Sequence, residues 1–138
     1  MPRLFTLEEA RLTLAQVRPA VEEMTAQKAR LDQLRAMVAM AGDRRPGGFY
    51  GGSAITDYAG LAAAQTVRLL NRIVHELVAA GIEIKDVDRG LIDFRSVQDD
   101  RIVYLCWMAG EPELDWYHEL AAGFSGRRPI PEHWKRRD

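Results

Sequence analysis

Side chains that could do acid–base or metal chemistry gather between residues 91 and 119 of the sequence. They comprise a thiol, an imidazole, phenols and carboxylates: Asp93, Tyr104, Cys106, Glu111, Glu113, Asp115, Tyr117, His118 and Glu119. Such groups serve proteins as acids, bases, nucleophiles and metal ligands. The candidate catalytic residues are His118, Glu119, Asp93 and Cys106. The candidate ligands of a divalent metal ion are His118, Glu119 and Glu111.

The spacing of these residues matches no standard metal-binding motif. In the H-E-x-x-H motif two histidines one helical turn apart bind zinc, and the second would fall at position 122, which is alanine. Two roles stay open for His118. It is either a metal ligand or general base, or a structural residue packed among tryptophans. The first role is possible because an unperturbed imidazole has a pKa of about 6.5, which suits proton transfer at neutral pH.

Strand alternation decides which of these side chains can meet. A two-residue turn at positions 111–112 would place Cys106 opposite Tyr117, the neighbour of His118. Cys106 and His118 would then point to opposite faces of the sheet. We therefore predict that they do not form a nucleophile pair, and a shift of one residue in register would reverse this prediction.

Cys106 and Asp93 also have purely structural interpretations. Cys106 lies among valine, leucine and tryptophan without a local positive charge, which is typical of a buried, unreactive thiol. Asp93 lies between two apolar residues, where a carboxylate is costly unless it is paired. It is either one carboxylate of a ligand or acid–base set or the partner of an arginine. The candidate arginines are Arg95, Arg101 and Arg127.

Two amphipathic helices are predicted before this segment. Thr6 and Glu9 form a capping box that begins the first, and apolar residues at alternating three- and four-residue steps continue it over residues 6–41, as in a coiled coil. Pro19 lies within this run and predicts a kink, because proline removes a backbone hydrogen bond. The second helix is expected over residues 56–80. Antiparallel packing would bury both apolar faces.

Glycine, proline and strand-forming residues predict the remaining elements. Residues 42–53 hold five glycines and predict a flexible loop between the helices. Runs of β-branched and aromatic residues at 91–95 and 101–108 predict a hairpin. A second turn at 110–113 leaves residues 114–120 as either a third strand or a short helix.

The predicted fold class is therefore α+β. A long antiparallel helical hairpin, kinked at Pro19, packs with a small antiparallel β-meander of two or three strands. The length of 138 residues predicts a single domain over residues 1–138. In it, residues 6–80 form the helical hairpin, and residues 82–138 form the β segment and an irregular basic tail.

Composition narrows the partners of the chain. A net charge of −1, from 19 basic and 20 acidic residues, provides no overall field for nucleic acid or an anionic membrane. A single cysteine excludes an internal disulfide framework and favours a reducing compartment. No run approaches the roughly 20 apolar residues of a membrane span. We expect a cytoplasmic protein without a membrane or nucleic-acid partner.

Several motifs resemble a bacterial and archaeal family called domain of unknown function 2203. They are FTLEEARLTLAQVRPAVEEM at the start of the chain and GLIDFRS, VYLCWMAGEPELDWYHEL and AGFSGRRPI in its second half. The resemblance covers nearly the whole chain and supports the predicted fold. It implies no activity, because the family has none established.

Two functions of different classes follow. The leading hypothesis is a non-catalytic cytosolic protein that self-associates, most simply as a homodimer, or binds a protein partner. It would bind through its helical surface and aromatic β segment. The basis is the helical seam, which has more apolar area than one partner helix covers, and the apolar Trp134, which docks either on the body of the chain or on a second chain. The alternative is a small enzyme or metal-binding protein. It would use His118 and Glu119 with Glu111, Asp93 or Cys106, and a divalent metal would be its cofactor.

Overall fold

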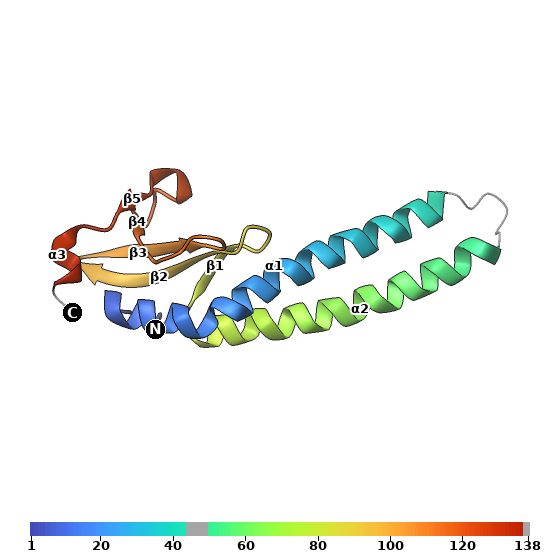
Figure 1. Cartoon of the computed structure of the whole chain (residues 1–138), viewed down its shortest axis with the longest axis horizontal. Coiled ribbons are helices and arrows are strands. Elements are labelled where there is room, and N and C mark those ends of the chain that lie inside the picture. The colour runs from blue at the N-terminus through green and yellow to red at the C-terminus, as the bar shows by residue number, and fades with distance from the viewer. Residues whose placement is uncertain (44–49, 137–138) are drawn as a thin grey trace.

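A computed structural model describes residues 1–43 and 50–136. The elements in chain order are α1 (Leu7–Asp43), α2 (Tyr50–Ala79), β1 (Glu83–Asp86), β2 (Leu91–Gln98), β3 (Arg101–Met108), β4 (Trp116–Glu119), the 3-10 turn η1 (Phe124–Gly126), β5 (Arg128–Pro129) and α3 (Glu132–Lys135). The predicted α+β class is confirmed, since a long helical hairpin packs beside an antiparallel sheet (Figure 1). The sheet has five strands in the order β1-β2-β3-β4-β5 rather than two or three.

The first helix begins as the sequence predicted. The backbone N–H of Thr6 donates to Glu9 Oε1 (2.8 Å), and the backbone N–H of Glu9 donates to Thr6 Oγ1 (3.0 Å). The helix continues through Pro19. Figure 1 shows its axis changing direction within the dark-blue part, which contains Pro19. No helix among the described residues is both long and apolar enough to cross a membrane.

The helices extend into the segment predicted to be a loop. Helix α1 reaches Asp43, and α2 begins at Tyr50 rather than near residue 56. Adding a residue to an existing helix gains a backbone hydrogen bond, whereas a glycine in it costs only about 1 kcal/mol. Two long, mutually packed helices can therefore include glycines. The rest of the predicted loop, residues 44–49, lies outside the described residues.

The inner face of the sheet forms the main core with the two helices. Phe94, Leu105 and Trp107 alternate along β2 and β3 with the residues of the outer face, and all three are buried in one cluster with apolar residues of α1 and α2. The Phe5 ring, just before α1, meets the Phe94 ring edge-on with centroids 5.1 Å apart. This packing fixes which side chains of β2 and β3 point outward.

The C-terminal tail is less irregular than predicted, because it contains β5 and α3. Trp134 of α3 is fully buried, and its indole N–H donates to Asp99 Oδ2 (2.9 Å). Asp99 and Asp100 form the two-residue turn between β2 and β3 with φ of 52° and 62°. The tail therefore docks against the predicted hairpin turn.

Candidate metal centre

The turn between β3 and β4 differs from the predicted two-residue turn at positions 111–112. The backbone N–H of Glu111 donates to Met108 O (3.0 Å), so the tight turn spans residues 108–111. Gly110 has a φ of 100°, as the third residue of a type II turn requires. The chain reverses direction two residues earlier than predicted, and an irregular connection then leads to β4, which begins at Trp116. Cys106 pairs with Trp116 rather than with Tyr117, so the predicted register between β3 and β4 is wrong by one residue.

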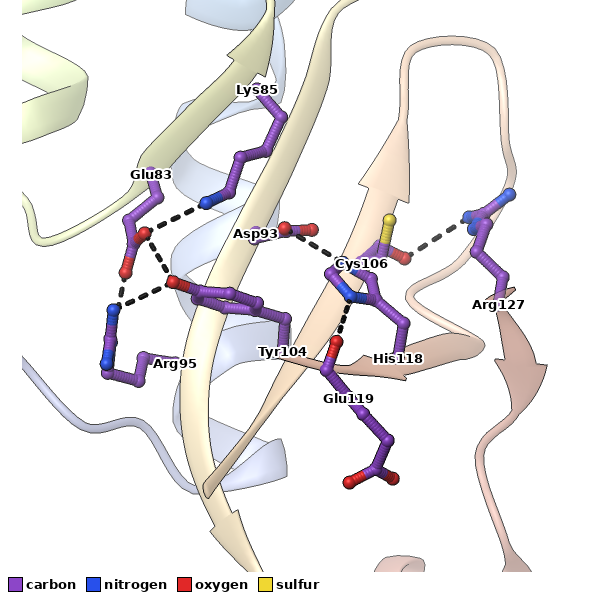
Figure 2. Close-up of polar contacts among 9 residues, drawn as sticks. All are labelled: Glu83, Lys85, Asp93, Arg95, Tyr104, Cys106, His118, Glu119 and Arg127. Carbon is purple, nitrogen blue, oxygen red and sulfur yellow. Dashed lines mark hydrogen bonds and ion pairs between the residues drawn. The ribbon is translucent and has the colours of Figure 1, made fainter. Parts of the chain in front are cut away.

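This difference of one residue reverses the direction of every side chain in β4. Cys106 pairs with Trp116, and across the other edge of β3 it pairs with Asp93. His118 pairs with Tyr104 and shares a face with Trp116, two residues earlier. The prediction that Cys106 and His118 lie on opposite faces is therefore wrong. Figure 2 shows Asp93, Cys106 and His118 gathered on the outer face.

Asp93, Cys106 and His118 form a compact buried cluster. One possible ligand atom of each lies within 4.8 Å of the other two. The three residues are 1%, 0% and 4% exposed. His118 Nε2 lies 2.9 Å from Asp93 Oδ2. Asp93 Oδ1 is buried and has no hydrogen-bond partner among the residues described. The cluster thus brings three different donor atoms together in a space closed to bulk water.

The hydrogen bonds of His118 fix its tautomer. His118 Nδ1 lies 2.8 Å from the backbone oxygen of Glu119. A carbonyl oxygen can only accept, so Nδ1 carries the hydrogen and donates it. Histidines that bind metals typically hold the second ring nitrogen in this way. Nε2 is therefore the ring atom aimed at the other two members of the cluster.

Burial dominates the electrostatics of the cluster. It raises the pKa of Asp93, and the charge of His118 opposes this rise. Burial and then the Asp93 carboxylate raise the pKa of the Cys106 thiol to about 12. The thiol is therefore protonated at neutral pH and is a poor nucleophile by itself.

Asp93 pairs with His118 and with none of the expected arginines. Each of these arginines has another carboxylate partner: Arg95 pairs with Glu83, Arg101 with Glu119 and Arg127 with Glu111. Arg101 lies far along the strand, at the hairpin end, where it donates two hydrogen bonds to Glu119. Asp93 itself therefore has no guanidinium partner among the described residues, whereas Arg127 lies close enough to Cys106 to oppose the rise in the pKa of its thiol.

The two glutamates among the candidate ligands lie outside the cluster. Glu111 Oε1 accepts hydrogen bonds from the backbone N–H of Met108 (2.7 Å) and from Arg127 Nη2 (2.6 Å). Glu119 pairs with Val103, so its side chain lies on the inner face. The structure therefore does not bring Glu111 and Glu119 together with His118.

A polar network that the sequence interpretation missed borders the cluster on the β1 side (Figure 2). The Tyr104 hydroxyl donates to Glu83 Oε1 (2.7 Å) and accepts from Arg95 Nη2 (2.7 Å). Lys85 Nζ lies 3.1 Å from Glu83 Oε1. Strand β1 was not expected, although the alternating residues Glu83, Ile84 and Lys85 were a weak signal for it.

Arg127 borders the other side of the cluster. Its Nη2 donates to the backbone oxygen of Cys106 (3.3 Å), and its guanidinium carbon lies 5.0 Å from the Trp116 ring centroid and 4.6 Å from that of Phe124. Arg127 thereby ties the segment after β4 to the strand that carries the thiol.

Comparison with known proteins gives one family. The family described as "Uncharacterized conserved protein (DUF2203)" matches residues 3–130. The chain belongs to the DUF2203 family. The matched span contains all three residues of the cluster and ends before α3, and it confirms the resemblance noted in the sequence motifs. No curated protein and no solved structure matches this DUF2203 chain.

Proposed function

We propose that this DUF2203 protein binds one divalent metal ion, with zinc as the best fit, through Asp93, Cys106 and His118. The observation that supports the proposal is the convergence of a carboxylate oxygen, a thiol sulfur and an imidazole nitrogen within 4.8 Å of one another. Zinc accepts all three kinds of ligand, and it commonly binds three protein side chains plus a small fourth ligand.

The distances in the cluster suit a small ion. Zinc bonds to sulfur at about 2.3 Å and to nitrogen or oxygen at about 2.0–2.2 Å, so tetrahedral donor atoms lie about 3.3–3.6 Å apart. Nε2 of His118 and Oδ2 of Asp93 start 2.9 Å apart, and no donor pair exceeds 4.8 Å. Small side-chain movements would therefore place the three donors around one ion.

The ion would also balance the charges of a buried site. Binding displaces the proton of the Cys106 thiol and any proton held between His118 Nε2 and Asp93 Oδ2. The thiolate and carboxylate that remain are costly in a buried place unless a cation compensates them. The unpartnered Asp93 Oδ1 would gain a positive neighbour.

Titration with Co²⁺ tests this proposal, because cobalt bound tetrahedrally by a thiolate absorbs in both the near-ultraviolet and the visible range. We expect one equivalent to bind and Zn²⁺ to displace it. Cys106→Ser should remove the sulfur charge-transfer band, and His118→Ala should abolish stoichiometric binding. Circular dichroism would check that each variant is folded.

His133 provides a matched control. Its Nε2 also lies 2.9 Å from a carboxylate oxygen, that of Asp99, but the imidazole is exposed and the pair lies far from the single cysteine. His133→Ala should therefore bind Co²⁺ as the unaltered protein does. The absence of a thiolate band in the unaltered protein, or its persistence in Cys106→Ser, would refute the proposal.

Self-association in the cytoplasm is a second candidate function. Large apolar side chains are exposed on both helices in the half of the hairpin remote from the sheet: Met37, Met40, Ile55, Tyr58 and Leu61. Exposed apolar patches of this kind commonly mark protein interfaces. The reduced, buried Cys106 is compatible with a reducing compartment. Light scattering of the purified protein at micromolar concentration tests this function, with a homodimer as the expected result.

A further inference from the structure

We infer that the exposed face of α2 pairs antiparallel with the same face of a second copy of this chain, which joins two helical hairpins into a four-helix bundle. This inference rests on the second candidate function, self-association, and does not depend on the metal centre. Its basis is the composition of α2, the thin packing of the remote half of the hairpin and the arrangement of charge along the helix.

The remote half of the hairpin has a small core of its own. Its buried residues are Leu34 of α1 and Ala59 and Ala62 of α2. Figure 1 shows that this half projects beyond the sheet, so only the two helices contribute to it among the residues described. Within the described part of the chain, the side of α2 that faces away from α1 therefore has no cover.

That side of α2 has the composition of an interface. Residues 54–67 contain a single charged residue, Asp57. The large side chains Tyr58 and Leu61 are 65% and 62% exposed. Protein surfaces normally carry about a quarter to a third charged residues, whereas the centres of interfaces are poor in charge and rich in aromatic anchors. A second helix would bury these side chains.

The exposed residues form a stripe that suits a helical partner. They follow one another at steps of four and three: Ala54, Tyr58, Leu61, Gln65, Arg68 and Arg72. Such steps produce the contact line of two packed helices. The N-terminal half of the stripe is apolar and lies beside Asp57, whereas its C-terminal half is basic.

This division of charge favours a second copy of the chain as the partner and an antiparallel orientation of the two α2 helices. In an antiparallel pair centred near residue 63, Tyr58 and Asp57 of one copy lie opposite Arg68 of the other. The twofold axis then forms each contact twice, as in a self-complementary interface. A parallel pair would place Arg68 beside Arg68 and Asp57 beside Asp57. Neither residue forms an ion pair with another residue in the described part of the chain.

Reciprocal charge exchange tests the inference. In the homodimer of Asp57→Arg, each contact sets arginine against Arg68, and in that of Arg68→Asp it sets two aspartates together. Each variant alone should dimerise about tenfold more weakly. An equal mixture of the two should recover the affinity of the unaltered protein, because both contacts in the mixed dimer pair opposite charges. Arg30→Asp, an exposed charge on α1, is the control and should have little effect.

The outcomes separate this inference from self-association itself. A strict monomer in light scattering would overturn both. A dimer whose affinity changes in neither single variant would overturn the α2 pairing and leave self-association standing. Weakening without recovery in the mixture would also contradict the antiparallel arrangement. Circular dichroism of each variant would confirm that its helices are retained.

Discussion

The two faces of the sheet are built by the same strands and are equally buried at their centre, yet their chemistry differs. Phe94 and Leu105 of the inner face lie among apolar side chains of the helices. Asp93, Cys106 and His118 of the outer face are polar and have few partners. Burial of apolar groups stabilises a fold, whereas burial of polar and charged groups opposes it unless they are well paired. The apolar inner face therefore contributes to stability, and the outer face is where we propose that a metal ion binds.

Adjacent residues of β3 give the strongest test of this comparison. Leu105→Ala on the inner face should lower the free energy of unfolding by about 2–5 kcal/mol, because it leaves a cavity in the main core. Cys106→Ala, one residue later, removes a single sulfur atom and should cost about 1 kcal/mol without metal. Denaturant unfolding of the metal-free proteins measures both values. Equal losses would contradict the division between the two faces.

The sequence predicted the elements on which both faces depend, because their signals are local. The capping box of Thr6 and Glu9 and the turn at residues 98–100 are each determined by a few neighbouring residues. Strands β1 and β5 were missed because they are short, and their pairing depends on neighbours distant in the sequence.

The sequence predicted which residue types make up the candidate site, but it did not predict that Asp93, Cys106 and His118 come together. Gly110 could have indicated a type II turn ending at Glu111, whereas Pro112 favoured the turn at positions 111–112. The predicted and observed registers of β3 and β4 differ by one residue, and in a strand that difference decides whether His118 meets Cys106 or faces away. Local propensity does not distinguish them, because the choice depends on packing of Trp116 and Tyr117 on opposite faces.

Zinc binding should change the difference in unfolding free energy between the Leu105→Ala and Cys106→Ala variants, by a smaller amount than the loss from Leu105→Ala. At a free zinc concentration of about 100 times the dissociation constant, binding to the folded state alone adds about 2.7 kcal/mol to stability. Leu105→Ala should gain this increment in full because its metal ligands are intact, and Cys106→Ala should gain none. Thermal unfolding with zinc and with a chelator measures the increment. A gain in Cys106→Ala would show that zinc stabilises the protein through other residues.

The smallest expected effect is a loss of stability at alkaline pH. It arises from Cys106 on the outer face of the metal-free protein. The folded protein raises the pKa of Cys106 from an ordinary value of 9.0 to about 12, so the folded state holds the thiol proton more tightly than the unfolded state does. This contribution is complete below pH 9 and is lost as pH rises from 9 toward 12. From pH 9 to 10 the loss is about 1 kcal/mol, because the unfolded thiol ionises while the folded thiol cannot.

Cys106→Ala lacks the thiol, so the difference in unfolding free energy between the unaltered protein and this variant should shrink by that amount. Other groups titrate equally in both and cancel in this difference. A constant difference across this range would mean that the thiol ionises as readily in the fold as outside it, and that the outer face is open to water.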